Sequence, residues 1–170
     1  MKQFINIRPE NHHDIDDIEN VAISAFTNQA YSNQTEHKII ARLRADDALS
    51  VSLVAQVNNK IVGHVAFSKV KINNEFVHWY GLAPVSVKAG YQRLGIGSRL
   101  IFSGLDAIRK LNAHGCVVLG EPDFYSKLGF KAYDGLTLAG VPPEYFQSLS
   151  FTGDMVIGRV EYHSAFNENE

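Results

Sequence analysis

The chain has 170 residues, 45% of which are hydrophobic, and a formal net charge of −2. This length suits one domain with a proper core, and the charge gives no case for nucleic acid or an anionic membrane as the main partner. No apolar run is long enough to span a membrane, and the N-terminal residues lack the apolar core of a signal peptide. The single cysteine, Cys116, cannot form an internal disulfide, so we expect a cytoplasmic protein. No metal-ligand spacing is found, and no metal is expected.

The N-terminal part of the sequence predicts one strand followed by two helices. Residues 4–8 have the pattern of a short strand, which Pro9 ends. Residues 14–26 carry apolar side chains at helical spacing. After a polar loop, Thr35 is the expected N-cap of a second helix.

Three strands follow, over residues 51–57, 61–72 and 76–87, joined by Asn-Asn turns. The second strand changes its hydrophobic phase near Ser68, which indicates a bulge or a change of sheet face. The third is apolar in both phases, as expected for a central strand buried on both faces. Proline cannot donate to a strand ladder, so we expect this strand to bulge or split at Pro84.

The stretch after the third strand, Gln92 to Gly97, is a glycine-containing loop that leads into a helix over residues 94–111. Unpaired N–H groups and the positive end of the helix dipole suit a phosphate or pyrophosphate. Two nucleotide motifs fit less well, because the dinucleotide fingerprint needs a glycine where Leu100 stands and the P-loop needs Gly-Lys-Ser/Thr where the chain has Gly97-Ser98-Arg99. A simple strand-to-helix turn is the remaining alternative.

The C-terminal third predicts shorter elements. They are a buried strand at 116–119, a short helix opened by Pro122, a strand at 131–133, a turn or short helix at 142–146, and a last strand at 155–162. No linker or repeat interrupts the chain. We therefore expect one domain over residues 3–163, in which 136–163 form a C-terminal extension and closing strand, followed by a frayed tail at 164–170.

Two motifs resemble those of the GNAT N-acetyltransferase superfamily. Gln92-Arg93-Leu94-Gly95-Ile96-Gly97, following Val85-Ser86-Val87, resembles its acetyl-CoA loop, and Phe124-Tyr125-Ser126-Lys127-Leu128-Gly129-Phe130 resembles its Tyr-x-x-Leu-Gly-Phe motif. The amino-acid sequences of residues 81–87 and 118–122 are similar to those of a bacterial subgroup of predicted acetyltransferases. The resemblance covers roughly residues 4–135.

This resemblance implies an α/β protein with the acyl-CoA N-acyltransferase (GNAT) fold. Such a fold has a twisted, mostly antiparallel mixed sheet with a central splayed parallel pair, flanked by helices. The implied activity is direct transfer of an acetyl group from acetyl-CoA to a primary amine of a small molecule or peptide. A non-catalytic acyl-CoA-binding or regulatory domain and an acyltransferase for longer acyl-CoA stay open as alternatives, as does a homodimer.

The resemblance also assigns roles to residues. The implied coenzyme site comprises Val85, Ser86, Val87, Gln92, Arg93, Leu94, Gly95, Ile96, Gly97, Ser98 and Tyr125, to which Arg93 and Arg99 could add charge. Tyr125 is the expected general acid for the leaving thiolate. Glu121 is the expected catalytic carboxylate and Glu36 the expected substrate-binding one, while His64, His78 or a water chain are alternatives for the base.

Overall fold

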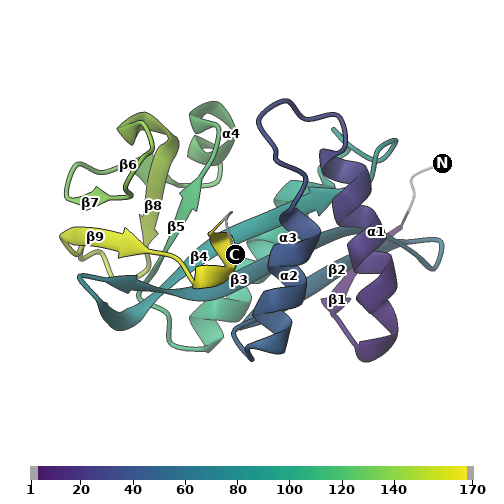
Figure 1. Ribbon diagram of the computed structural model, residues 1–170, viewed down its shortest axis with the longest axis horizontal. Helices are drawn as coiled ribbons and strands as arrows, with labels where there is room; N and C mark the ends of the chain where they lie inside the picture. Colours follow the sequence, from purple (N-terminus) through teal and green to yellow (C-terminus); the bar gives the residue numbers. More distant parts are fainter. Residues whose placement is uncertain (1–3, 168–170) are drawn as a thin grey trace.

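The computed structural model describes residues 4–167, whose strands form a twisted mixed sheet (Figure 1). The order along the sheet is β1-β2-β3-β4-β5-β8-β6, while β9 pairs with both β3 and β7. The strands are β1 (Ile5–Pro9), β2 (Val51–Val57), β3 (Lys60–Ile72), β4 (Glu75–Val87), β5 (Gly115–Leu119), β6 (Lys131–Ala132), β7 (Leu136–Thr137), β8 (Phe146–Ser150) and β9 (Gly158–Glu161). Pairing is antiparallel except for β4–β5 and the short β7–β9 contact, so the predicted mostly antiparallel sheet with a central parallel pair is confirmed.

Helices cover both faces of the sheet. They are α1 (Ile15–Phe26), α2 (Glu36–Ala45), α3 (Ile96–Lys110) and α4 (Pro122–Ser126), with 3-10 turns η1 (His12–Asp14), η2 (Pro143–Tyr145) and η3 (Ser164–Phe166). The helices α1 and α2 lie on one face and α3 on the other (Figure 1). Alternation in β2 explains this, because Leu53 and Ala55 pack with α3 while Val54 packs with α1 and α2. Between residues 4 and 167, no helix is both long and apolar enough to cross a membrane.

The central parallel pair separates along its length. Trp79 to Gly81 of β4 pair with Gly115 to Val117 of β5, and the ladder ends there. Beyond Gly81, β4 keeps its partner β3 up to the Val87–Gly63 pair, while β5 stays paired on its other edge with β8 from Gly115 to Leu119. The last six residues of β4 therefore have one edge that no strand covers.

The pairing of β3 with β4 is irregular near both Ser68 and Pro84, the two positions at which the sequence predicts irregular strands. The β3–β4 register shifts between Val65 and Phe67, opposite Pro84, and again between Lys69 and Lys71. The predicted bulge at Pro84 is therefore confirmed, and the phase change near Ser68 is absorbed by these shifts within one continuous β3.

Several expected boundaries are wrong. The α3 helix begins at Ile96, because the left-handed Gly95 precedes it, and not at residue 94. Thr35 stands at the N-cap of α2, but its hydroxyl donates to Asn33 Oδ1 at 2.6 Å and caps no helix N–H. The last strand contains only Gly158–Glu161, and the β7 and β8 strands were not predicted at all.

The expected frayed tail is also partly ordered. Residues Ser164–Phe166 form η3, where Arg42 Nη2 donates to Ser164 Oγ at 2.9 Å and His163 Nε2 lies 3.3 Å from Asp46 Oδ2. These contacts attach the end of the chain to α2. Gln3 and residues 168–170, which the expected domain and tail included, lie outside the described residues.

A partly buried polar cluster lies between the end of β1, β2, β3 and α2. Arg44 donates to Glu10 at 3.0 and 3.1 Å, Ser52 Oγ donates to Glu10 Oε1, and His64 Nε2 lies 2.7 Å from Ser52 Oγ. Because the serine proton goes to the carboxylate, His64 must donate its Nε2–H to Ser52. Its Nδ1 atom is then a buried acceptor with no partner among the described residues.

This arrangement predicts that the fold weakens on mild acidification. Burial lowers the pKa of His64 from 6.5 to about 4, with Glu10 opposing and Arg44 adding to the shift. Between pH 6.5 and about pH 4, His64 is protonated in the unfolded chain and neutral in the folded chain. We therefore expect the unfolding free energy to fall by about 2 kcal/mol from pH 7 to pH 5.

Urea unfolding at both pH values measures this loss. His64→Gln should reduce it, whereas Val65→Ala, which removes a fully buried but untitratable group from the same strand, should keep it. An equal loss in wild type and His64→Gln would contradict the assignment.

Candidate active site

The loop between β4 and α3 is held by hydrogen bonds at three places. Tyr91 N donates to Lys88 O at 2.9 Å, which closes a turn, and Ala89 N donates to Ser24 Oγ of α1 at 3.1 Å. Gln92 Nε2 reaches back to Val87 O at 2.9 Å. The loop is thus tied to both the end of β4 and the end of α1, so that the start of α3 has a defined position beside the open edge of β4.

The N-terminus of α3 has no side-chain cap. Gly95 occupies the N-cap with φ +83°, a backbone conformation that favours glycine, and the first helical bond runs from Arg99 N to Gly95 O at 3.1 Å. Preceding N–H groups have no partner within the helix. A Cβ added to Gly97 would meet nothing closer than Val87 Cγ2 at 3.8 Å, so a ligand can approach this turn. Free donors and the helix dipole together suit an anionic group.

The open edge of β4 supplies further backbone donors. Lys88 N donates to Val62 O of β3 at 2.8 Å. Successive N–H groups of a strand point to opposite sides, so the Val87 N–H faces away from β3, toward the gap between β4 and β5. The Gln92 side chain bonds to the Val87 carbonyl on this same side. The gap therefore holds an oriented N–H donor, as a carbonyl oxygen with developing negative charge requires.

A cavity of about 560 Å³, which we call the loop cavity, joins these donors. It brings together eight of the predicted coenzyme residues, namely Val85, Val87, Gln92, Arg93, Gly95, Ile96, Gly97 and Ser98. Three others are not in its wall: Ser86 is buried with its hydroxyl unpartnered among the described residues, Leu94 points outward, and Tyr125 lies in the core.

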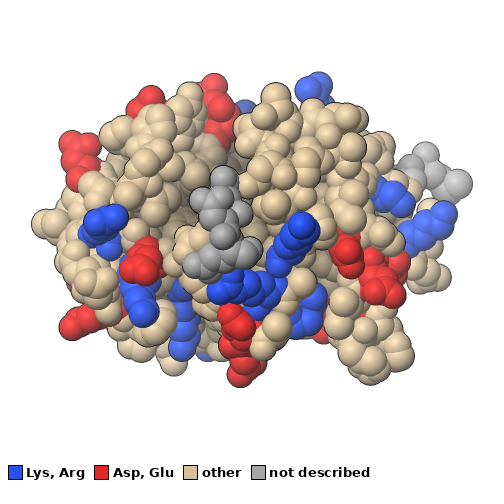
Figure 2. All heavy atoms as spheres, in the orientation of Figure 1, with Lys and Arg blue, Asp and Glu red and all other residues tan. Residues whose placement is uncertain are grey.

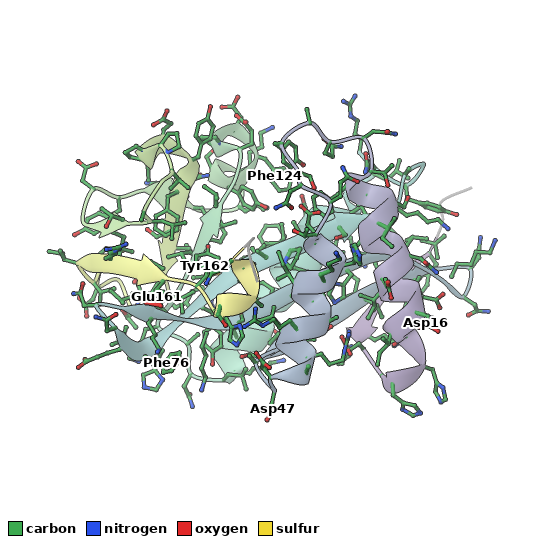
Figure 3. All side chains as sticks on the ribbon, in the orientation of Figure 1. Asp16, Asp47, Phe76, Phe124, Glu161 and Tyr162 are labelled. Carbon is green, nitrogen blue, oxygen red and sulfur yellow. The ribbon has the colours of Figure 1, made fainter. Side chains whose placement is uncertain are left out.

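Sequence reasoning missed part of the loop cavity's wall. Phe124 of α4 and Tyr31 of the α1–α2 loop both line it. Figure 2 shows a hollow in this face between these two parts of the chain, and Phe124 lies beside it in Figure 3. Phe124 is 38% exposed although it precedes a buried tyrosine, and this exposure shows only in the structure.

The two arginines near the loop differ in their surroundings. Arg93 lines the loop cavity, with φ +64°, so it is available to an anion there. Arg99 is on the outer side of α3, where its Nη2 donates to the carbonyl of Ile5 in β1 at 3.2 Å. Of the two, only Arg93 is placed to add charge to a bound phosphate.

Tyr125 belongs to α4, at the edge of the gap. Its ring covers Gly120, where a Cβ would lie 2.3 Å from Cε2, and it meets Phe130 edge-on with ring centres 5.8 Å apart. Burial, together with the nearby Cys116 and Tyr31, raises the pKa of Tyr125 to about 12. Tyr125 thus keeps its proton at neutral pH.

The two predicted carboxylates occupy different places. Glu36 begins α2 and accepts from Ser32 Oγ at 2.7 and 2.8 Å, next to Tyr31, whose pKa is raised by burial and by Glu36. Glu121 is exposed between β5 and α4, and its carbonyl accepts the N–H of Tyr125 at 3.1 Å. Neither carboxylate lines the loop cavity, and the structure does not bring them together.

A second, larger cavity of about 860 Å³ lies by β9, and we call it the β9 cavity. Its wall includes Ala83 and Leu119, which stand on the separated ends of β4 and β5, together with Tyr162 and Phe166. It shares no lining residue with the loop cavity. The gap is therefore approached by one cavity beside α3 and by another beside β9.

Comparison with known proteins settles the family. Residues 48–132 match the family described as acetyltransferase (GNAT) domain. YhbS of Escherichia coli (strain K12), an uncharacterized N-acetyltransferase, is 34% identical over 152 residues, which cover 85% of this chain and 91% of YhbS. The chain belongs to the GNAT acetyltransferase family. The predicted family and its acetyl-CoA-dependent acyltransferase activity are thereby confirmed.

Solved GNAT structures agree with the whole fold. A GNAT family acetyltransferase from Brucella melitensis in complex with acetyl-CoA is 43% identical, with a TM-score of 0.87, and the match covers 98% of this chain and 100% of that one. E. coli YhbS in complex with CoA is 30% identical, with a TM-score of 0.85, covering 100% of this chain and 96% of that one. The predicted GNAT fold is confirmed along the described chain.

Proposed function

We propose that the protein transfers an acetyl group from acetyl-CoA directly to a primary amine. The observation that carries this proposal is the open edge of β4 beside the uncapped N-terminus of α3. The two solved relatives named above were crystallised with acetyl-CoA and with CoA, respectively. In this proposal the diphosphate lies on the N–H groups of residues 95–98, and the pantetheine arm follows Val85 and Val87 into the gap.

The reaction needs four groups, and this chain offers three of them. The Val87 N–H would bind the thioester oxygen, Arg93 and the α3 N-terminus would hold the diphosphate, and Tyr125 would donate a hydrogen bond to the departing sulfur. A bond forms between the amine nitrogen and the carbonyl carbon while the carbon–sulfur bond breaks. The nitrogen gives its proton to a base, and the departing thiolate, hydrogen-bonded by Tyr125, takes up a proton from water.

The base is assigned less directly. Glu121 is our proposed catalytic carboxylate because it follows β5 at the gap, and it would act through water because its exposed side chain lines neither cavity. Glu36, fixed by Ser32 beside Tyr31, is proposed to bind the acceptor. His64 does not suit either role, because its side chain is fully buried against Ser52 and Glu10 and its pKa is near 4.

A two-step experiment tests the proposal. Calorimetric titration with coenzyme A should show saturable binding, and a panel of primary amines mixed with acetyl-CoA should release free thiol with at least one acceptor. Binding without thiol release across the panel would favour a non-catalytic acyl-CoA-binding domain. Faster thiol release from a longer acyl-CoA than from acetyl-CoA would identify the longer acyl-CoA as the acyl donor, with the same acyl-transfer reaction.

A further inference from the structure

The hydroxyl of Tyr162 is buried where β4 and β5 separate, and it has no hydrogen-bond partner among residues 4–167. Its ring lies against Gly81, the last β4 residue that pairs with β5. A Cβ added to Gly81 would lie 3.0 Å from Tyr162 Cε2 and 3.3 Å from Cζ, the atom that carries the hydroxyl. Only glycine leaves room for this contact, so the polar end of Tyr162 lies over the apex of the gap.

Tyr162 and Tyr125 lie on opposite faces of the sheet. Tyr125 belongs to the core between the sheet and α3, whereas Tyr162 packs with the cluster on the other face, which contains Trp79 and Val117. Burial, and then Cys116 and Tyr125, raise the pKa of Tyr162. Both tyrosines therefore keep their protons at neutral pH.

The ring of Tyr162 is held by the end of the chain. Phe166 of η3 meets it edge-on, with ring centres 5.1 Å apart, and η3 is attached to α2 through Arg42 and Ser164. Both aromatic residues line the β9 cavity, whose wall also includes Ala83 and Leu119 (Tyr162 is labelled in Figure 3). The contact with Phe166 therefore fixes the ring of Tyr162 at the wall of this cavity.

We propose that the Tyr162 hydroxyl binds the nitrogen of the acceptor amine, which enters through the β9 cavity. This inference rests on the proposed function and deepens it by naming the acceptor's entrance and the group that holds it. Because the loop cavity contains the proposed coenzyme site, the β9 cavity offers a separate approach to the thioester. The Val87 N–H already serves the thioester oxygen, which leaves Tyr162 for the nucleophile.

The chemistry suits an uncharged amine. An attacking amine must direct its lone pair at the carbonyl carbon, so its N–H groups are free to donate, and the Tyr162 oxygen can accept one of them. A neutral hydroxyl does not stabilise an ammonium ion as strongly as a carboxylate would, and therefore does not hold the amine in its unreactive form. In the free protein the same oxygen lacks a partner, so a bound amine restores a hydrogen bond that folding has removed.

Tyr162→Phe is a clean test because it removes one oxygen and keeps the ring on Gly81 and Phe166. With an amine from the panel that the wild type acetylates, we expect the acceptor KM to rise about tenfold and kcat/KM to fall similarly. Affinity for coenzyme A, measured by calorimetry, should stay within about twofold. Tyr133→Phe is the matched control, since Tyr133 packs against the same cluster but lines neither cavity, and it should behave as wild type.

The outcomes separate this inference from the proposed function. An unchanged acceptor KM and kcat in Tyr162→Phe, with an active wild type, would overturn the role of Tyr162 alone. A wild type that binds coenzyme A but acetylates no amine would overturn the proposed function and this inference with it. Urea unfolding adds a second test, because the variant should be at least as stable as the wild type. A lower stability would show that the hydroxyl has a structural partner instead.

Discussion

Replacing Gly97 with aspartate should weaken coenzyme A binding by about 100-fold, equivalent to about 2.7 kcal/mol at 25 °C. The added carboxylate would stand in the first turn of α3, among the N–H groups proposed to hold the diphosphate. Like charges about 4 Å apart near a protein surface repel by several kcal/mol, which exceeds the loss predicted here. Folding should not suffer, since a Cβ at Gly97 has 3.8 Å of clearance and a negative charge favours a helix N-terminus.

The matched control is Gly97→Asn, which has the shape of aspartate without its charge. We expect the asparagine variant to stay within about tenfold of the wild type, and the aspartate penalty to shrink in 1 M salt because screening weakens charge repulsion. Calorimetric titration with coenzyme A measures both. Equal affinities of the two variants would show that no anionic group binds at this turn.

The loop and its helix could be predicted from the sequence because the signals are local. Glycine at positions 95 and 97 and the apolar side of residues 96–108 act within one short stretch, and the structure places eight of the predicted coenzyme residues around one cavity. Pro84 is similar, since the loss of a ladder donor in an otherwise apolar strand predicts irregular pairing without knowledge of the partner strand.

The strands after residue 135 were predicted poorly because their polar residues are satisfied by contacts with segments distant in sequence. The β8 strand contains Gln147 and Ser148, both buried, and polar residues in a short segment are typical of a loop. The structure satisfies them from other segments, since Gln147 Nε2 donates to Gly120 O at 3.2 Å and Ser148 Oγ to Lys131 O at 3.4 Å. A reading of local pattern has no access to partners that are 17 and 27 residues away.

The same limit applies to the candidate site. Phe124 and Tyr31 come together in one cavity and Tyr162 lines the other, and none of their local patterns sets them apart from core or surface aromatics. The position of Tyr162 depends on Gly81, which is distant in sequence. Because Gly81 has no side chain, the tyrosine ring can pack against it. The residues that shape the gap are therefore found by contact, not by motif.

Replacing Tyr125 with phenylalanine should lower kcat by about 100-fold, the lower end of the range for a positioned proton donor. With a pKa of about 12, Tyr125 stays protonated across the neutral range and is always available as a donor. An ordinary thiol has a pKa of about 8.5, so complete proton transfer from Tyr125 is uphill. Its contribution is a hydrogen bond that strengthens as negative charge develops on sulfur, and such a bond lowers the barrier without tightening ground-state binding.

The readouts that isolate this role are the separation of kcat from binding and the pH profile. Coenzyme A affinity should be unchanged in Tyr125→Phe, because the ring still covers Gly120 and meets Phe130. The exposed Tyr145→Phe, in the same lobe, should retain wild-type kcat. Because Tyr125 does not ionise below about pH 11, the fold-loss between wild type and variant should be constant from pH 7 to pH 10. Wild-type turnover in Tyr125→Phe would remove the tyrosine from the mechanism and leave the leaving thiolate to take its proton from water.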